Sequence, residues 1–531
     1  MNTKKTKSLT YILSLAVIAL STTTSCKKDK ETPSRSDIER VEKITDSIFL
    51  YAKEAYLWNT SLPTYEVFNP RQYVQSDEEA GFNAELLKIT KYPINPSTGV
   101  SYEEVAKYPS ETKYSFISNT DNDNPIAFVG NAKSSVDLEG NGYDLGIDIK
   151  LYGTETNFDV FVTDVARNSP AEKAGIMRGD EITSINGTAV GNNFDAQEDL
   201  LNNTFYNDKV TPATLKGIKR DGSALSAVLS VSSYKGNPIS KDTIYTAGAK
   251  KIGYMAYSSF TTLDKNSKPV LDAVFSKFAT AGVTDLIIDL RYNGGGYVTT
   301  AQYLANLIAP ISIDNSVMFS EHYNKNMQDK NIPLLSKKPY LNDDNTIRYS
   351  GGKMVTYADI PYSVAENTIL FDKQGLLNNI RNVVFIVSSS TASASELVIN
   401  SLKPYMNVQL VGEQTYGKPV GFFPIKIDKY DVYLSMFESR NKNDEADYYQ
   451  GFTPDEPASD NVSYLLGDRN ENSINAAYKY LVNGAFPGIS SSSTSSIKTS
   501  RGAILKPFTE ANKKLPAKGF RGMIEDRIKT K

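Results

Sequence analysis

Residues 250–480 alternate short, largely apolar runs with segments of helical periodicity. Runs this short and this apolar are typical of strands buried on both faces of a sheet. They lie at 286–290 (LIIDL), 383–387 (VVFIV) and 408–411, and a helix is expected from Ser393 to Leu402 between the last two. The alternation predicts an α/β fold with a sheet covered by helices.

Each of these three runs is followed by a loop with unusual composition. The loops are DLRYNGGG at 289–296, SSSTASAS at 388–395 and GEQTYGKP at 412–419. Sites in open α/β sheets form outside the carboxyl ends of the strands, so the three loops are expected to converge on one pocket. The glycine loop alone also suits a tight strand-to-helix turn. It has neither the Walker spacing nor the GxGxxG spacing of nucleotide sites.

The serine loop offers a candidate nucleophile. Ser393 to Glu396 fits the capping box S-x-x-E, so a purely structural role at the helix start is one interpretation. The alternative is chemical: a helix N-terminus presents unpaired N–H groups and partial positive charge to a developing oxyanion. The alanines on both sides of Ser393 leave room for a substrate backbone.

A base for this serine must be found among few residue types. The chain has one His, His322, in a polar stretch that suggests a solvated loop, and one Cys, Cys26. This excludes a His-rich zinc site, a thiolate cluster and an intrachain disulfide, and no cofactor is expected. Lys418 is the next candidate, because it lies between Gly417 and Pro419 before an apolar run that could desolvate its amine. The simpler alternative is a turn lysine in water.

The N-terminus has the features of a targeting segment. Lys4, Lys5 and Lys7 precede a short apolar run at 9–20, so residues 1–25 are interpreted as a secretory signal peptide. The following Thr24–Cys26 resembles a bacterial lipobox. That resemblance implies lipidation of Cys26, a membrane partner through this lipid, and a place in the cell envelope, at the outer membrane or on the periplasmic side. A cleaved secretory peptide with an incidental Cys is the alternative, and residues 26–35 form a polar tether.

The next two segments differ in their pattern of apolar residues and turns. Residues 36–115 show helical spacing and predict a small N-terminal helical domain. Residues 136–235 have short strands, a Ser-Pro-Ala helix start at Ser169 and an Asn186-Gly187 turn, and the run closely resembles a PDZ domain. PDZ domains bind peptide C-termini at a sheet edge, which would place peptide contacts at Tyr143, Leu145, Gly146 and Ile147. A small β module with a structural role is the alternative.

The end of the chain, residues 485–531, is expected to be a Ser-rich linker and a basic tail. From Lys498 onward it has ten Lys or Arg and three Asp or Glu, a net of +7. Disorder is the simplest expectation, and a role on acidic surfaces is the alternative. The whole chain has a formal charge of only −3, so the charge balance indicates no nucleic-acid partner.

The order of these motifs resembles the C-terminal processing (tail-specific) peptidases. The order is a PDZ-like run, DLRxNxGG, TASASE and GExTxGK, with 25 residues between Ser393 and Lys418. The resemblance covers residues 136–480 and implies a crotonase/Clp-like mixed α/β peptidase core at 250–482. It also implies that Ser393 attacks a peptide carbonyl, Lys418 takes its proton, and the N–H groups of Gly296 and Ala394 form the oxyanion hole. The substrates implied are proteins or peptides with accessible, often apolar, C-termini.

One departure from that family pattern concerns the base. Many members have a Gln four residues after the Lys, and here Phe422 holds that place. Glu396 or Tyr416 could orient Lys418 instead. A weakly active lipoprotein that binds peptides through its PDZ domain therefore stays an alternative, and an acyl-CoA enzyme of the crotonase fold is a more distant one.

Overall fold

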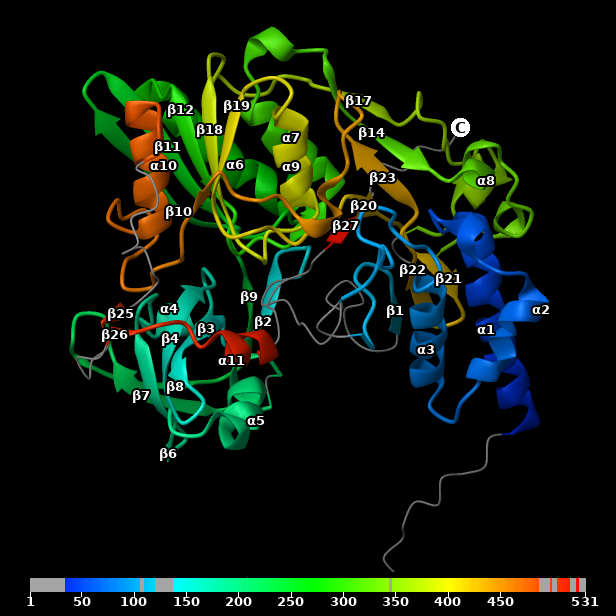
Figure 1. Ribbon diagram of the computed structural model, residues 1–531, viewed down its shortest axis with the longest axis horizontal. Coiled ribbons are helices and arrows are strands. Elements are labelled where there is room, and N and C mark those ends of the chain that lie inside the picture. Colours follow the sequence, from blue (N-terminus) through cyan, green and yellow to red (C-terminus); the bar gives the residue numbers. More distant parts are fainter. Residues whose placement is uncertain are drawn as a thin grey trace, which may run out of the picture.

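The computed structural model describes residues 34–105, 109–119, 137–207, 209–342, 346–486, 497–498, 504–515 and 522–524. Three parts stand side by side in it (Figure 1): an α/β core, a β domain below its left end, and a helical N-terminal domain on the right. The expected signal peptide, Cys26 and the serine run lie outside the described residues.

The core is built on a six-stranded sheet with the order β10-β11-β12-β18-β19-β24. All neighbours are parallel except β10 and β11. The strands are β10 (Ile239–Ala247), β11 (Lys250–Tyr257), β12 (Asp285–Asp289), β18 (Asn382–Val387), β19 (Asn407–Gly412) and β24 (Glu456–Pro457). The three runs expected to be strands are confirmed as β12, β18 and β19.

Helices cover both faces of this sheet, and the strand sequences show why. Side chains alternate faces along a strand, and on β18 Val383 and Phe385 belong to one apolar cluster while Val384 and Ile386 belong to another. The first cluster includes residues of α6 (Lys268–Ala281), α7 (Val298–Ile308) and α9 (Ala394–Leu402), and the second includes α10 (Asn472–Asn483). Both faces of β18 are therefore buried, as its continuous apolar run predicted.

A second, four-stranded sheet extends the core toward the N-terminal domain. It has the order β17-β14-β23-β20, with β14 (Val317–Tyr323), β17 (Thr368–Leu370), β20 (Val420–Gly421) and β23 (Phe437–Arg440). His322 lies in β14, partly buried, and bonds the Ser320 hydroxyl at 2.9 Å. The expectation of a solvated loop at His322 was wrong, because the polar residues around it alternate along a strand. The helix α8 (Lys325–Gln328) and the hairpin β15 (Tyr349–Ser350) and β16 (Lys353–Met354) follow β14 and precede β17.

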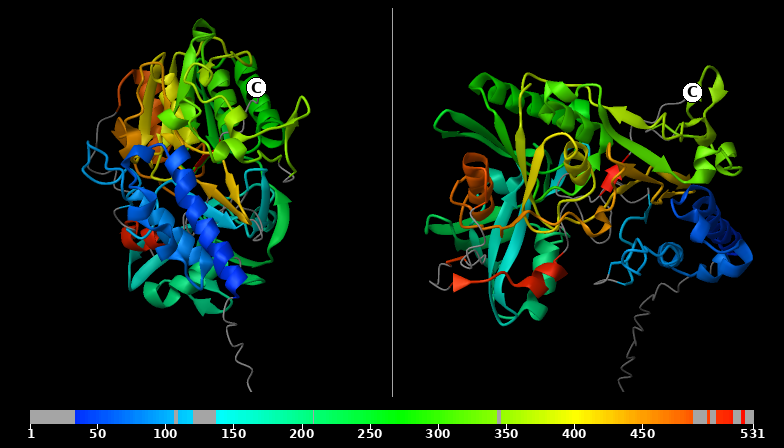
Figure 2. Two further views of the ribbon diagram at one scale, coloured as in Figure 1. Left: turned by 90° about the vertical axis from the view of Figure 1, so that its right-hand side faces the viewer. Right: turned by 45° about the horizontal axis from the view of Figure 1, so that its top comes forward.

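The N-terminal domain is helical, as expected. Its helices are α1 (Arg35–Ala55), α2 (Tyr65–Phe68) and α3 (Glu78–Thr90), and its strand β1 (Phe116–Asn119) joins the core hairpin of β21 (Ile425–Ile427) and β22 (Tyr430–Tyr433). Apolar residues of α1 and α3 belong to the same cluster as the core helices, so this domain shares the main hydrophobic core. Figure 2 shows these helices packed along one side of the molecule.

The β domain has a sheet with the order β3-β4-β5-β7-β8, in which β3 is an edge. Its elements are β3 (Ile147–Thr154), β4 (Asn157–Val165), α4 (Pro170–Lys173), β5 (Glu181–Ile185), β6 (Thr188–Ala189), α5 (Phe194–Phe205), β7 (Ala213–Ile218) and β8 (Ala224–Leu229). The strands β2 (Asn141–Asp144) and β9 (Ser232–Lys235) pair at its junction with the core. Asn186 and Gly187 both have positive φ, 47° and 83°, as the predicted hairpin turn requires.

The C-terminal segment has regular secondary structure among its described residues. It contributes β25 (Ile497–Lys498), β26 (Ile504–Leu505), α11 (Thr509–Lys514) and β27 (Gly522–Ile524). The simple expectation of a disordered tail is therefore wrong for these residues, because apolar side chains among them find partners on the β domain and the core.

Candidate active site

The three loops that follow β12, β18 and β19 are tied to one another by hydrogen bonds. The Thr391 hydroxyl donates to the Leu290 carbonyl at 2.8 Å, and the Ser395 hydroxyl donates to the Asn293 carbonyl at 3.1 Å. The Tyr416 N–H donates to the Thr391 carbonyl at 2.9 Å. Since the three strands are parallel neighbours, their carboxyl ends share one edge, and the expected convergence of the loops is observed.

Ser393 has a strained backbone at the start of α9. It is the N-cap residue, with φ 57° and ψ −107°, in a region that costs a non-glycine residue about 1–3 kcal/mol. Its side chain is fully buried, and within the described residues its Oγ makes no hydrogen bond. The capping box predicted from Ser393 to Glu396 is present, with the Ser393 N–H donated to the Glu396 carboxylate. The Oγ itself lacks a hydrogen bond in the described part of the chain, and a buried hydroxyl without a partner costs free energy unless a ligand supplies one.

Glu396 links the serine loop to the lysine loop. Its Oε2 accepts the N–H groups of Ser393 and Lys418, both at 2.8 Å. Its Oε1 accepts the Thr415 hydroxyl at 2.5 Å and the Gly417 N–H at 2.7 Å. Burial raises the pKa of this carboxyl, and these four hydrogen bonds oppose the rise. Four donors aimed at two oxygens suit a carboxylate, so Glu396 fixes the backbone on both sides of the site.

Lys418 is completely buried, and this changes its acidity. Burial lowers the pKa of its amine from 10.5 to about 7, while the charges of Glu103 and Glu396 act in the opposite direction. The amine lies 4.3 Å from the centre of the Phe422 ring and 5.7 Å from that of Tyr114. The residue that replaces the expected Gln therefore contacts the amine through its ring face. Tyr416 donates its hydroxyl to the Lys113 carbonyl at 2.9 Å.

The N-terminal domain supplies two groups to this lysine that the sequence did not indicate. Glu103 is buried and accepts hydrogen bonds from Tyr56, Ser115 and Ser435. The Tyr114 hydroxyl donates to the Gly417 carbonyl at 2.6 Å, directly before Lys418. Glu103 lies in the unremarkable stretch SYEEVAKYPS, far from the motifs, so only the packing of this domain on the core reveals it.

The glycine loop forms a short strand, β13 (Gly295–Tyr297), between Phe260 and the C-terminal strand β27. Gly296 has φ 138°, and a Cβ at this position would lie 2.1 Å from the Phe260 carbonyl oxygen. Only glycine therefore fits here. Ala394 is the first residue of α9, so its N–H precedes the helical hydrogen-bond ladder.

The four expected peptide-binding residues run from β2, through the loop that follows it, to the first residue of β3. Tyr143 lies in β2 with 68% of its surface exposed, whereas Leu145 and Ile147 are buried in the apolar cluster of the β domain. Gly146 has φ 74°, and a Cβ there would clash with Ser169 at 2.2 Å. Leu145 and Ile147 therefore pack inside the domain, and of the four residues only Tyr143 is open to solvent.

The β domain reaches the glycine loop through one buried arginine. Arg178 donates to the Tyr292 hydroxyl at 2.6 Å and forms an ion pair with Asp460 of the core. Asp460 also accepts Arg291 at 2.7 Å, and Arg291 bonds Asp289 and Glu471. Both arginines, Asp289 and Glu471 are buried and Asp460 is partly buried, so these charges depend on one another for hydrogen bonding. Arg291 and Tyr292 of the glycine loop therefore couple this loop to the β domain.

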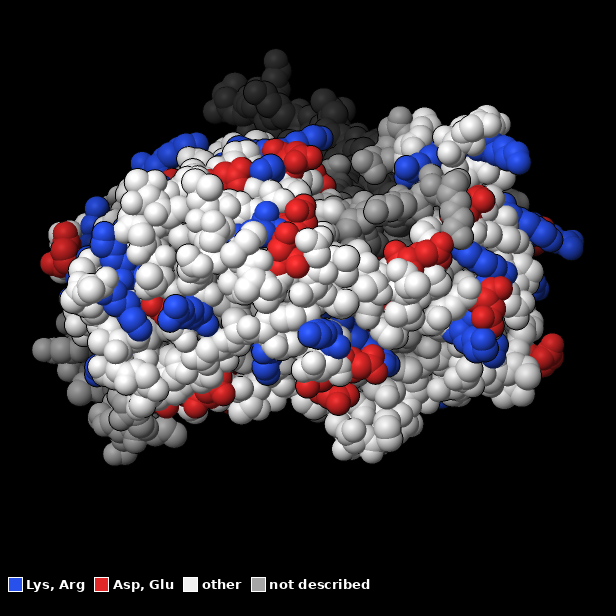
Figure 3. Space-filling view, turned by 90° about the horizontal axis from the view of Figure 1, so that it is seen from above, with Lys and Arg blue, Asp and Glu red and all other residues white. Residues whose placement is uncertain are grey.

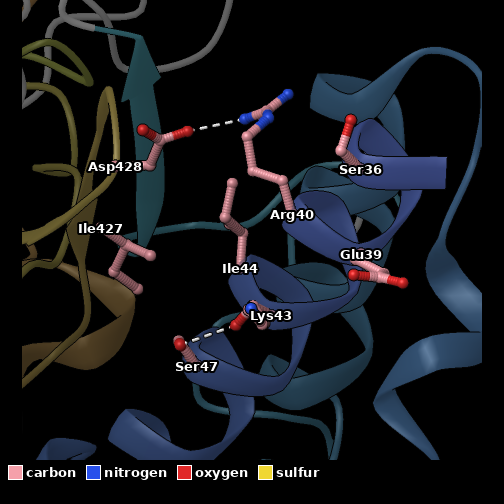
Figure 4. Close-up of a pocket in the computed structure, with 8 residues that line it drawn as sticks. All are labelled: Ser36, Glu39, Arg40, Lys43, Ile44, Ser47, Ile427 and Asp428. Atoms are coloured by element: carbon pink, nitrogen blue, oxygen red, sulfur yellow. Dashed lines mark hydrogen bonds and ion pairs between the residues drawn. The ribbon is translucent and has the colours of Figure 1, made fainter. Parts of the chain in front are cut away.

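A pocket among the described residues lies away from these loops. A surface pocket of about 470 Å³ is lined by Ser36, Glu39, Arg40, Lys43, Ile44, Ser47, Ile427 and Asp428 (Figure 4), and holds none of the three loops. No cluster of three or more His, Cys, Asp or Glu in the described chain is arranged to hold a metal ion. Among the helices described, none is long and apolar enough to cross a membrane.

Comparison with known families agrees with this architecture. Residues 251–458 match Peptidase family S41, and residues 136–231 match the PDZ domain. The core is an S41 peptidase domain. A crystal structure assigned as an S41 protease from Bacteroides fragilis NCTC 9343 superposes with a TM-score of 0.55 at 22% identity, over 83% of this chain and 97% of that one. That likeness shows a shared fold.

Two relatives that this chain resembles are named as processing peptidases. The chloroplastic C-terminal processing peptidase of Tetradesmus obliquus is 25% identical over 52% of this chain and 51% of its own length. The carboxy-terminal processing protease CtpA of Bacillus subtilis is 28% identical over 50% of this chain and 45% of its own. The chain thus spans about half the length of these relatives. The PDZ and S41 matches support assignment to the C-terminal processing peptidases.

Proposed function

We propose that this protein is a serine endopeptidase in which Ser393 is the nucleophile and Lys418 the general base. Two observations carry the proposal: a buried Ser393 hydroxyl without a hydrogen bond among the described residues, and a buried Lys418 amine whose pKa burial lowers to about 7. Their backbones are held by the same carboxylate oxygen of Glu396. A lysine with this pKa is substantially neutral at physiological pH and can accept a proton.

The proposed reaction has two steps. The Ser393 Oγ attacks the peptide carbonyl as its proton passes to the Lys418 amine, and the N–H groups of Gly296 and Ala394 stabilise the oxyanion. The Lys418 ammonium then gives this proton to the leaving amine, which leaves an acyl-enzyme on Ser393. A water molecule attacks the ester, Lys418 takes its proton and returns it to the Ser393 oxygen, and the carboxylate product departs.

The proposed substrates are unfolded proteins or peptides with accessible, apolar C-termini, presented by the PDZ domain. The test compares purified protein with Ser393→Ala, Lys418→Ala and, as a control, Ser390→Ala of the same loop, on an unfolded protein with an apolar C-terminus. Cleavage is expected from the parent and Ser390→Ala only. Equal cleavage by Ser393→Ala would exclude Ser393 as nucleophile. Inactive parent protein that still binds the substrate would favour the weakly active peptide-binding alternative.

We also propose a lipid anchor on Cys26 that holds the protein at the cell envelope. Its support is the position of the only Cys of the chain after a basic start and a short apolar run. Cys26→Ala should move the protein from the membrane fraction to the soluble fraction in fractionated cells, and unchanged membrane retention would contradict the anchor.

A further inference from the structure

The C-terminal segment contacts both domains that the proposed function assigns to substrate. Residues 504–515 lie on the PDZ domain, and residues 522–524 lie on the peptidase core (Figure 1). The positions they occupy on each domain are the ones where a peptide chain would add to an open strand.

On the PDZ domain, the segment pairs with the edge strand β3. The Gly153 N–H donates to the Lys506 carbonyl and the Phe508 N–H donates to the Leu151 carbonyl, both at 2.8 Å, with antiparallel geometry. The Asn512 side chain continues this pairing. Its Oδ1 accepts the Leu151 N–H and its Nδ2 donates to the Leu151 carbonyl, both at 2.7 Å. The outer edge of β3 is therefore used here by the chain itself.

The same segment also packs against α5, so it lies between this helix and the edge strand β3. Lys514 pairs with Asp195 of α5 at 3.1 Å, and the Phe508 ring meets that of Phe194 edge-on at 5.7 Å. Ala511 and Leu515 are buried in the apolar cluster that also contains residues of β3 and α5. The segment thus fills the space between β3 and α5, where a PDZ domain takes a peptide by strand addition.

On the core, β27 runs parallel to the glycine strand β13, with Gly296 opposite Met523. The Gly295 carbonyl and the Tyr297 N–H are bonded to Phe260, at 2.9 Å each. Backbone groups of successive strand residues point to opposite edges, so the N–H of Gly296 points toward β27. This is the donor proposed for the oxyanion hole.

The side chain of Ile524 anchors β27 beside the base. It is buried in a cluster with Phe116, Leu138, Phe422 and Tyr433. It also forms a parallel bridge with Phe422, the residue whose ring contacts the Lys418 amine. The apolar side chain of Ile524 therefore packs into an apolar cluster next to the proposed dyad, as an apolar substrate end would.

We propose that residues 504–515 and 522–524 act as an internal ligand, the first competing with substrates for the PDZ groove and the second for the catalytic cleft. Competition for the catalytic cleft rests on the proposed function, whereas competition for the PDZ groove does not. Because a tethered segment has an effective concentration in the millimolar range, it can exclude peptides from both places without high intrinsic affinity.

The test measures binding rather than cleavage, in a Ser393→Ala background. The probe is a fluorescent synthetic peptide with the sequence of residues 504–531. Its Kd is measured by fluorescence anisotropy for the full chain and for a chain ending at residue 496. It is also measured for two variants of the full chain, Ile524→Asp and Asn512→Ala. The control variant is Ile311→Asp, which places the same change as Ile524→Asp at an exposed position of the core. Thermal unfolding verifies that each variant is folded.

We expect the shortened chain to bind the probe at least about ten-fold more tightly than the full chain. Ile524→Asp and Asn512→Ala should fall between them, and Ile311→Asp should match the full chain. If the shortened chain does not fold, the two point variants decide. Equal Kd values for the full chain and its tail variants would overturn the proposal. Absence of cleavage by the parent protein, with the binding differences intact, would count against the proposed peptidase activity and leave the internal ligand standing.

Discussion

At the residue scale, the chemistry of the site depends on burial more than on residue type. Lys418 has a pKa of about 7 because no water reaches its amine, although Glu103 and Glu396 favour the charged form. The same amine in an exposed turn would stay protonated near pH 7 and could not accept a proton. Position within the packed core therefore gives this lysine the lowered pKa that its proposed role as base requires.

The pH dependence of activity follows from this pKa. We expect kcat/KM to rise about ten-fold per pH unit below pH 7, as the Lys418 amine loses its proton, and to level off above it. Initial rates on a fluorogenic peptide between pH 5 and 9 measure this. A profile that is flat from pH 5 to 7 would contradict Lys418 as the base.

The same shift affects stability in a defined direction. The unfolded chain keeps a proton on Lys418 up to about pH 10.5, whereas the folded chain loses it near pH 7. Stability from this group therefore rises by about 1.4 kcal/mol per pH unit between these values, and the destabilisation is largest at and below pH 7. Lys418→Met should raise the free energy of unfolding most at pH 7 or below and least near pH 10. Urea unfolding at pH 6, 8 and 10 tests this, with Lys426→Met as a control.

Glu396 provides a second test at this scale. Glu396→Gln keeps the shape but turns an NH₂ group toward two backbone or hydroxyl donors. We expect it to lower the free energy of unfolding by about 1–3 kcal/mol and to reduce kcat. The control is Glu413→Gln, an exposed glutamate of the lysine loop at 412–419, which Glu396 contacts. Wild-type stability in Glu396→Gln would mean that the four donors do not need a carboxylate.

At the element scale, α9 and β13 are positioned by close backbone contacts. β13 fits beside Phe260 because Gly296 has no side chain, and α9 begins at the strained Ser393, which the adjoining loops hold in place. The strain and the close approach occur at the two points where a substrate carbonyl would be bound in the proposed reaction.

Gly296→Ala tests this scale directly. Its Cβ would lie 2.1 Å from the Phe260 oxygen, so β13 must shift, and we expect kcat to fall by about 10²–10³ together with a lower melting temperature. Gly282→Ala is the matched control: it also has positive φ, 73°, but no atom lies within 4 Å of the added Cβ. Equal activity loss in both variants would mean that backbone strain alone, and not contact with Phe260, explains the effect.

At the scale of the whole molecule, three domains contribute to one site. The N-terminal domain places Glu103 and Tyr114 near Lys418, and the PDZ domain places Arg178 against the glycine loop. On the face seen in Figure 3, acidic and basic side chains are interspersed, and large areas carry neither. Charge on this face therefore forms no field of one sign that would steer a charged partner.

Arg178→Leu should uncouple the PDZ domain from the core. It removes one ion-pair partner of the partly buried Asp460 and leaves Arg291 as the other, so we expect a loss of about 3–5 kcal/mol of stability and faster proteolysis between the two domains. Limited trypsin digestion and urea unfolding measure this. Arg167→Leu, which removes an exposed ion pair with Glu172, should change neither. Resistance of Arg178→Leu equal to the parent would contradict the coupling.

The sequence by itself determined the α/β core, three of its strands, the loops at their ends and the candidate residues Ser393 and Lys418, whereas Gly296 was implied by the family resemblance. These follow from local patterns: apolar runs, helix starts, and glycines where backbones approach closely. Tertiary structure alone decided that Glu396 joins two loops, that Glu103 lies near the base, that His322 is in a strand, and that the basic tail lies against both substrate-facing edges. The reason is physical. Burial and contact between residues hundreds of positions apart depend on packing, which no local pattern specifies.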